Sequence, residues 1–316
     1  MGLKETFQKQ GGMKLIKQYV RNGVIGTAVG EFLLLGKDRV ALEQLREAVQ
    51  LKLRKKLEKK YYKVLVDFDK NYDKDCEHKS SNKVWICWFQ GIENAPPIVQ
   101  KCYESIKTNL KDRDVVLITA ENMNQYVQFP DYILDKWKSG VITNTHLTDL
   151  LRLELLIRYG GTWVDATVFC SANRENIPDY LLDSDLFFYQ TLKPGRDGHV
   201  IYSSSWYMTA RTNNRILMAT LELCYEYWKN SNRLMDYYLL HDFFAIVLDF
   251  YPVDWHRVIP RDNSTPHILL LRLFDQYDEE MWNAIKGQAP FHKLSYKFKE
   301  DDIDNTFYRH IMSGGK

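Results

Sequence analysis

The sequence TDLLRLELLIRYGGTWVDATVFC spans residues 148–170 and decides how the surrounding chain folds. Its first part is rich in leucine and predicts a buried helix over residues 147–159. Gly160 and Gly161 are expected to end that helix and turn the chain tightly. The run from Thr162 to Phe169 has the composition of a strand. This stretch therefore predicts a helix, a tight turn and a strand in succession.

The strand predicted over residues 162–169 has two unlike faces. Because side chains alternate along a strand, one face is expected to meet a core and carries Val164, Ala166 and Val168. The other face carries Trp163, Asp165 and Thr167. A polar strand face is more often exposed to solvent than catalytic. Here the face follows a buried helix that also carries charged residues, which favours a functional site.

Asp149 and Arg152 lie three residues apart and so share one face of the predicted helix. Most other positions of the helix are Leu or Ile, and a charged pair on a buried helix is costly unless it is satisfied. One interpretation is an intrahelical salt bridge. The other is a pair that faces a polar ligand, and the nearby Asp165 favours a site.

The rest of the chain predicts an α/β fold. Strands are expected over residues 84–89 and 115–119, and helices over residues 97–106, 215–229 and 234–249. The order β-α-β-α-β is typical of an open sheet with parallel strands, where ligands bind beyond the carboxyl ends of the strands. Residues 71–82 are polar and resemble a linker, so we expect a helical region over 1–80 and an α/β domain over 81–316.

A basic amphipathic helix is predicted from Val40 to Tyr61. Its apolar stripe consists of Leu42, Leu45, Val49, Leu53, Leu57 and Tyr61. Its basic residues are Arg46, Lys52, Arg54, Lys55, Lys56, Lys59 and Lys60. The helix either packs on its own domain or rests on an anionic membrane surface. No apolar run is long enough to span a bilayer; Val24 to Leu35, the nearest, is interrupted by Glu31.

Composition excludes several classes of function. The net charge of +2 gives no field that would attract nucleic acid. Five cysteines without a C-x-x-C pair indicate reduced thiols rather than a disulfide framework or a zinc site. The N-terminus lacks the features of a signal peptide. We therefore expect a cytoplasmic protein.

The block TDLLRLELLIRYGGTWVDAT resembles the central motif of bacterial capsular polysaccharide synthesis glycosyltransferases, which are related to glycosyltransferase family 32 and to large glucosylating toxins. The similarity covers about residues 82–300. It implies a GT-A type, Rossmann-like nucleotide-sugar-binding fold. It also implies retaining transfer of galactose or glucose from a UDP-sugar to a lipid-diphosphate-linked saccharide.

The resemblance also implies roles for single residues. Asp149, Arg152 and Asp165 would be catalytic and bind the nucleotide sugar together with Trp163, and Trp85 would stack on uracil unless it is a core residue. Near the C-terminus, Lys293 and Lys297 would hold the diphosphate, unless they belong to an ordinary basic surface loop. Ser205 and Trp206 would border the acceptor pocket. His241 either faces the cleft or, as we favour, is a core residue.

A divalent metal, Mn²⁺ or Mg²⁺, is implied through Asp165, Thr167 and His292. The commonest form of the motif has a second Asp where this chain has Thr167, and a hydroxyl is a poorer ligand for these metals than a carboxylate. The acceptor would lie at the inner face of the cell membrane, with the basic helix as the peripheral contact. Two alternatives remain: transfer to a protein side chain, and a membrane-surface protein that binds nucleotide sugars without turnover.

Overall fold

The computed structural model describes residues 12–192, 199–298 and 304–314. Its strands are β1 (Lys83–Cys87), β2 (Asp114–Ile118), β3 (Gly161–Val164), β4 (Val168–Cys170), β5 (Leu186–Gln190), β6 (Ser203–Ala210) and β7 (Phe291–Lys293). Its α-helices are α2 (Gly12–Arg21), α3 (Ile25–Leu35), α4 (Arg39–Asn71), α5 (Pro97–Asn109), α6 (Met123–Tyr126), α7 (Asp131–Lys138), α8 (Asn144–Tyr159), α9 (Arg215–Asn230), α10 (Leu239–Phe250), α11 (Pro252–Trp255), α12 (Ile268–Arg272), α13 (Glu279–Gln288) and α14 (Phe307–Met312).

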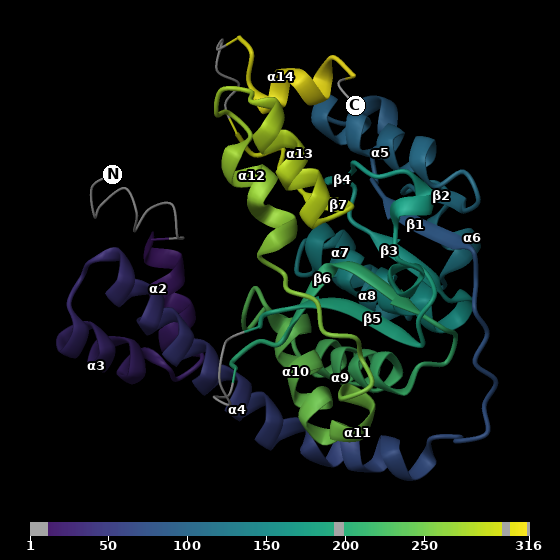
Figure 1. Cartoon of the computed structure of the whole chain (residues 1–316). Coiled ribbons are helices and arrows are strands. Elements are labelled where there is room, and N and C mark those ends of the chain that lie inside the picture. Colours follow the sequence, from purple (N-terminus) through teal and green to yellow (C-terminus); the bar gives the residue numbers. More distant parts are fainter. Residues whose placement is uncertain (1–11, 193–198, 299–303, 315–316) are drawn as a thin grey trace.

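A five-stranded sheet in the order β2-β1-β3-β6-β5 lies in the middle of the molecule (Figure 1). β1 pairs in parallel with both β2 and β3. β6 runs antiparallel to β3 and β5 antiparallel to β6, and neither of these strands was predicted. The α/β class and the parallel strands expected from the sequence are confirmed. A second sheet pairs β4 with β7.

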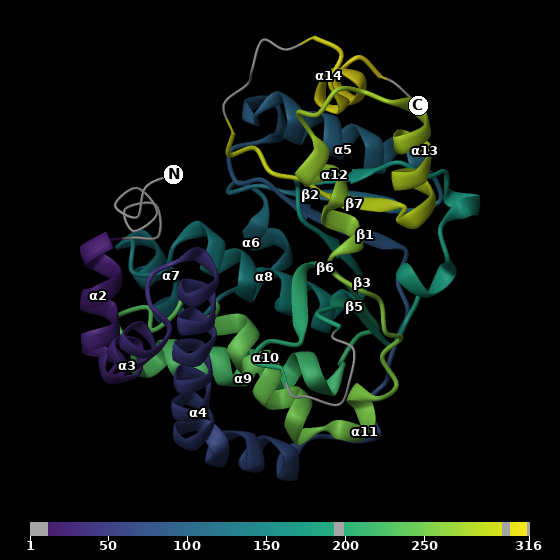
Figure 2. The same ribbon diagram turned by 60° about the vertical axis from the view of Figure 1, so that its left-hand side comes forward.

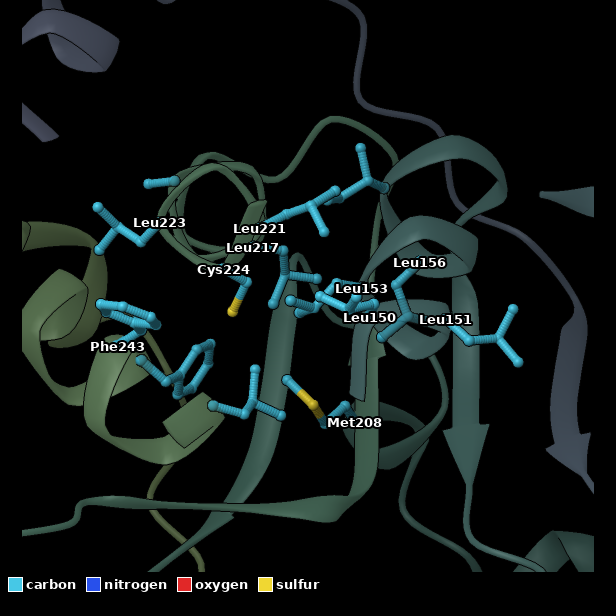
Figure 3. Close-up of a cluster of buried hydrophobic side chains, with 14 of the residues drawn as sticks. Leu150, Leu151, Leu153, Leu156, Met208, Leu217, Leu221, Leu223, Cys224 and Phe243 are labelled. Atoms are coloured by element: carbon cyan, nitrogen blue, oxygen red, sulfur yellow. The ribbon is translucent and has the colours of Figure 1, made fainter. Parts of the chain in front are cut away.

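Helices cover both faces of the large sheet, so the core has two parts (Figures 1 and 2). On one face, α8, α9 and α10 pack over Trp85, Trp163 and Met208. Figure 3 shows leucines of α8 and α9 meeting Phe243 of α10 and Met208 of β6 in this cluster. On the other face, α5, α13 and α14 pack over Val84 and Val164. Both faces of β3 are therefore buried, including the one that carries Trp163.

Helix α8 carries the charged pair and is held at both ends. The Thr143 hydroxyl caps its start by accepting from the backbone N–H of His146. Gly160 and Gly161 then take φ values of 67° and 95°, the left-handed region that favours glycine. A Cβ on Gly161 would lie 2.3 Å from the carbonyl oxygen of Lys83 in β1. The glycine pair thus lets the chain turn while β3 lies directly against β1.

The strand expected over residues 162–169 is two strands in different sheets. β3 ends at Val164 and β4 begins at Val168, with a turn between them in which the Val168 N–H donates to the Asp165 carbonyl oxygen at 3.0 Å. The break arises because β3 pairs with β6, whereas β4 pairs with β7. Val164, Ala166 and Val168 are buried as expected, but Asp165 and Thr167 belong to the turn rather than to one strand face.

Helix α4 confirms the predicted amphipathic pattern but not a free apolar stripe. Leu45, Val49, Leu53, Leu57 and Tyr61 are all buried, and α4 packs on α9 and α10. Burial of these residues favours the alternative in which the helix packs on its own domain, and the membrane contact of the basic helix stays a prediction. The division of the chain near residue 80 stays a prediction, although part of α4 belongs to the core beneath the sheet. Among the described helices, none combines the length and apolar composition needed to cross a bilayer.

Candidate active site

The charged residues of the motif meet where the parallel strands end. Asp165 follows β3, and its N–H donates to the Trp206 carbonyl oxygen of β6 at 2.8 Å. Its Oδ1 atom accepts a hydrogen bond from the Trp163 indole at 3.0 Å and lies 3.7 Å from Nη2 of Arg152. Its Oδ2 atom lies 3.4 Å from Nζ of Lys293. The Asp165 carboxylate is thus held between two cations. Because 27% of its side chain is exposed, a ligand can reach it.

Arg152 joins the two carboxylates of the motif. Its Nη2 atom lies 3.3 Å from Oδ1 of Asp149, which confirms that the pair shares one helix face. The guanidinium also donates to the backbone carbonyl of Ser205 and lies over the Trp163 ring, 5.0 Å from its centroid. Burial raises the pKa of Asp149, and the positive charge of Arg152 opposes that rise. Arg152 is therefore held on several sides with its charge directed at Asp149 and Asp165.

Lys293 enters the site from the far end of the sequence. β7 pairs with β4 so that Lys293 lies opposite Val168, and the backbone N–H of Leu294 donates to the Thr167 carbonyl oxygen at 2.9 Å. The Lys293 ammonium donates to the Thr167 hydroxyl at 2.5 Å. Thr167 and Asp165 thus share one lysine cation.

The expected metal set is not assembled, because His292 points away from it. His292 neighbours Lys293 in β7, and adjacent side chains of a strand face opposite ways. Its ring is fully buried and its Nε2 atom lies 2.8 Å from the Ser171 hydroxyl. Burial lowers the pKa of His292 to about 3, so the ring is neutral. Among the described residues, no group of three or more His, Cys, Asp and Glu side chains could hold a metal ion.

The arrangement around Asp165 does not fit a divalent cation either. The Lys293 ammonium already interacts with the Oδ2 atom of Asp165 and with the Thr167 hydroxyl. A metal would need these oxygens, and it would lie against a positive charge.

Trp85 is a core residue and not a stacking platform. Its side chain is 0% exposed, and its indole donates to the Gly160 carbonyl oxygen at 2.9 Å. A base cannot reach this ring, which corrects the role expected for it. Trp88, which the sequence did not single out, is the first residue beyond β1, at the edge where ligands of parallel sheets bind.

Trp88 is half-buried, and its indole nitrogen has no partner among the described residues. Its ring meets that of Tyr296 edge to face at 5.4 Å. Lys297 is exposed beside Tyr296, with its Nζ atom 5.9 Å from that ring. The segment that follows Lys293 therefore brings Tyr296 and the exposed Lys297 beside Trp88 at the end of β1. The sequence placed Trp88 inside the strand predicted over residues 84–89, and only the end of β1 at Cys87 shows that it lies beyond the strand.

The two residues expected at the acceptor pocket differ in how open they are. The Trp206 ring is largely buried and stacks on Tyr189 at 4.6 Å, while its indole donates to Asn263 at 2.8 Å. One face of the Trp206 ring is thus already covered by protein. Ser205 is half-buried, and its backbone carbonyl oxygen accepts a hydrogen bond from Arg152. Its acceptor role stays a prediction.

A loop over residues 231–238 borders the site, where the sequence predicted the start of a helix. The helix begins at Leu239 instead. The Tyr237 carbonyl lies 3.3 Å from Nε2 of His146 in α8. Burial raises the pKa of Tyr237, and the negative charges of Asp149 and Asp165 add to the rise. His241 is half-buried nearby. Burial, followed by the positive charge of Arg152, lowers the pKa of His241 to about 4. His241 therefore borders the charged cluster as a neutral ring.

The larger cavities of the described residues lie elsewhere. One of about 530 Å³ is lined by residues such as Asp185, Arg211, Arg215, Asp254 and Arg257. These residues lie around the amino end of β5, away from Asp165. Arg211 and Arg215 are already paired with Asp185 and Asp254 at 3.0 and 2.5 Å. We place the site by its chemistry, at the carboxyl ends of β1 and β3.

This fold and site define an α/β protein with a cluster of carboxylates and cations at the ligand-binding edge of its parallel strands. The family described as capsular polysaccharide synthesis protein matches residues 38–311. The chain belongs to this family.

Three fungal proteins are similar to parts of the chain. They are O-glycosyltransferase braB of Annulohypoxylon truncatum (27% identical over 175 residues, 50% of this chain), O-glycosyltransferase PaGT of Phomopsis amygdali (26%, 44% of this chain) and glycosyltransferase afumC of Aspergillus fumigatus (28%, 27% of this chain). The chain covers 40%, 36% and 24% of their lengths. A solved structure, the PaToxG glycosyltransferase, is 15% identical and covers 63% of this chain and 79% of its own, with a TM-score of 0.36. That agreement is too low to support an argument about the fold.

Proposed function

We propose that this protein is a glycosyltransferase with a GT-A type fold. It moves a hexose, galactose or glucose, from a UDP-sugar to a lipid-diphosphate-linked saccharide in capsular polysaccharide synthesis. Transfer retains the anomeric configuration and takes place at the cytoplasmic face of the membrane. Membership of the family and the names of the three fungal relatives support glycosyl transfer.

One observation carries the proposal: Asp165 lies between Arg152 and Lys293 where the parallel strands end. A carboxylate accepts hydrogen bonds from hydroxyl groups, so Asp165 suits the hydroxyls of a ribose or of the donor sugar. Trp88 lies past the neighbouring strand β1 and suits stacking on the base. A nucleotide sugar would thus lie along the edge from β1 to β3.

The reaction requires positive charge at the leaving group. The bond between the sugar and the diphosphate breaks with its electron pair on the UDP oxygen, while the acceptor hydroxyl bonds to the sugar and loses its proton. Cations that face the growing negative charge lower the barrier. Lys293 is placed to supply this charge, and Lys297 is exposed a few residues further on. Arg152 orients Asp165, and Asp149 orients Arg152.

The divalent metal expected from the sequence stays a prediction. His292 is turned away, and the oxygens of Asp165 and Thr167 hold a lysine. The proposed chemistry therefore uses Lys293 as the cation at the leaving group, and no step depends on a metal. Chelation tests this directly.

Transfer to a protein side chain and nucleotide-sugar binding without turnover remain the alternatives. The experiment that separates them is a panel of UDP-sugars scored by release of UDP, with and without a lipid-linked saccharide. A glycosyltransferase releases UDP slowly by hydrolysis from its preferred donor and faster with the right acceptor. A binder without turnover releases none from any donor, and that result would refute the proposal. Release that rises only when a protein acceptor is added would favour the first alternative.

A further inference from the structure

The first two described helices form a hairpin at the edge of the molecule. α2 and α3 pack on the start of α4 through a small core that includes Tyr19, Val24 and Ala28 against Leu45 and Val49. Figures 1 and 2 show this hairpin beside the sheet and its covering helices, joined to them by α4. The hairpin thus shares a small core with α4, to which α3 contributes Ala28 and, in part, Ile25.

The C-terminal part of α3 is apolar and exposed. We call its residues the α3 tip: Val29, Phe32, Leu33, Leu34 and Leu35. Leu33 and Leu34 are 76% and 81% exposed, and Glu31 is the one charged residue in α3. Single exposed apolar residues are ordinary, but a contiguous apolar patch marks a contact surface. The α3 tip is such a patch, at the end of a helix that packs on α4.

Basic residues are frequent in the hairpin that carries the α3 tip. Lys14, Lys17 and Arg21 are exposed on α2, and Lys37 and Arg39 follow α3 directly. The acidic residues between Gly12 and Arg39 are Glu31 and Asp38, so this segment is net positive. An apolar patch on a net positive segment is complementary to a bilayer with anionic headgroups, because the apolar groups enter the interface and the cations remain among the phosphates.

The hairpin also contacts the loop that borders the site. The side chains of Gln18 and Asn22 both donate to the Met235 carbonyl oxygen, at 2.7 and 2.6 Å. Two residues further, Tyr237 contacts His146 of the site helix α8. A surface that holds the hairpin would therefore also hold the rim of the site.

We propose that the α3 tip inserts into the interface of an anionic lipid bilayer and docks the protein on it. The contact is the hairpin and not the stripe of α4, which is buried. The docking itself stands on the patch alone. Only its purpose, to present a lipid-linked acceptor to the site, rests on the proposed function.

Flotation with two kinds of vesicle tests the docking: phosphatidylcholine alone, and an equimolar mixture with phosphatidylglycerol. The full chain should float with the anionic vesicles and partly resist high salt, because the apolar contact is not screened. Leu33→Ser/Leu34→Ser should reduce partition at least about tenfold. The matched control, Val253→Ser/Leu271→Ser, removes two apolar side chains of similar exposure, 66% and 78%, on α11 and α12, and should float like the wild type.

A second pair of variants separates the hairpin from α4. Lys14→Gln/Lys17→Gln should weaken flotation, whereas Lys52→Gln/Lys59→Gln, on the exposed side of α4, should change it little. Equal flotation of the wild type and Leu33→Ser/Leu34→Ser would overturn the proposal. A wild type that is dimeric, does not float and becomes monomeric in that variant would assign the patch to a second copy instead.

Hydrolysis of the donor in solution is measured on the same variants. It should be unchanged by Leu33→Ser/Leu34→Ser, because these side chains lie outside the site. Flotation without any donor hydrolysis would refute the proposed function and leave the docking intact. Donor hydrolysis without flotation would refute the docking and leave the proposed function intact.

Discussion

Replacing Arg152 alone, and then together with Asp149, tests whether the pair serves the fold or a ligand. In Arg152→Met, Asp149 loses the cation 3.3 Å from its Oδ1 atom. Only 9% of Asp149 is exposed, so water cannot replace that cation. Asp165 is more exposed and keeps Lys293 at 3.4 Å, so losing Arg152 should destabilise this carboxylate little. The loss of stability in Arg152→Met should therefore come almost entirely from the unpaired Asp149 carboxylate.

The size of the effect follows from this burial. Removing one partner of a buried ion pair costs about 3–5 kcal/mol, because the other charge remains unpaired. Replacing both partners by apolar groups of similar volume is about neutral. We therefore expect Arg152→Met to lower the free energy of unfolding by about 3 kcal/mol. Asp149→Leu/Arg152→Met should stay within about 1 kcal/mol of the wild type.

The pH dependence of the single variant has a definite sign. Burial already raises the pKa of Asp149 in the folded protein, and loss of Arg152 removes the interaction that opposes the rise. A carboxyl group with a raised pKa in the folded state is better tolerated when protonated. Its contribution to stability is thus present at low pH and lost as pH rises through the folded pKa. The deficit of Arg152→Met should therefore shrink as the pH falls toward about 3.9, the ordinary pKa of an aspartate.

Urea unfolding followed by tryptophan fluorescence measures the stabilities, and calorimetric titration with UDP measures ligand binding. If the pair serves the donor, the double variant folds normally and loses UDP affinity. Wild-type affinity in the folded double variant would show that the pair is only structural. An Arg152→Met protein as stable as the wild type would contradict the burial on which the estimate rests.

Four further predictions concern the same edge of the sheet. Asp165→Ala should abolish transfer while leaving the melting temperature nearly unchanged, since the side chain lies in a partly exposed turn; near-normal turnover would show that the site is misplaced. Lys293→Ala should lower turnover by about a hundredfold through loss of charge at the leaving group. Lys297→Ala should have a smaller effect, and equal losses in the two variants would show that Lys293 is not the main cation at the leaving group. Trp88→Ala should weaken UDP binding by about 1–3 kcal/mol if the indole stacks on the base, which fluorescence titration measures. Exhaustive chelation should leave UDP release largely intact if Lys293 supplies the cation, and complete loss restored by Mn²⁺ would reinstate the metal.

The features that depend on local spacing were predictable from the sequence. A three-residue spacing places Asp149 and Arg152 on one helix face whatever surrounds the helix. The glycine pair ends α8 because few other residues adopt its backbone angles. The alternation of strands and helices likewise predicted the parallel strands.

The features that depend on distant pairing were not predictable. The break at Asp165 exists because β4 leaves the large sheet to pair with β7, more than a hundred residues away in the chain. In β7, a register shift of one residue exchanges the faces, so the sequence could not say whether His292 or Lys293 enters the site. Trp85 and Trp88 posed a similar problem, since only the end of β1 distinguishes a core ring from one at the edge.

The β4–β7 pairing also has a consequence for the order of folding. Residues 144–165 already supply Asp149, Arg152 and Asp165 while the chain is being made, but the cation on Thr167 lies 126 residues further on. Contacts of such large sequence separation form late, because a long loop must close first. Until β7 is in place, the turn after β3 lacks its lysine and has no partner strand for Val168. Ligand binding at Lys293 should therefore appear last during refolding, after the helix signal is complete, and a bound nucleotide would stabilise that final pairing.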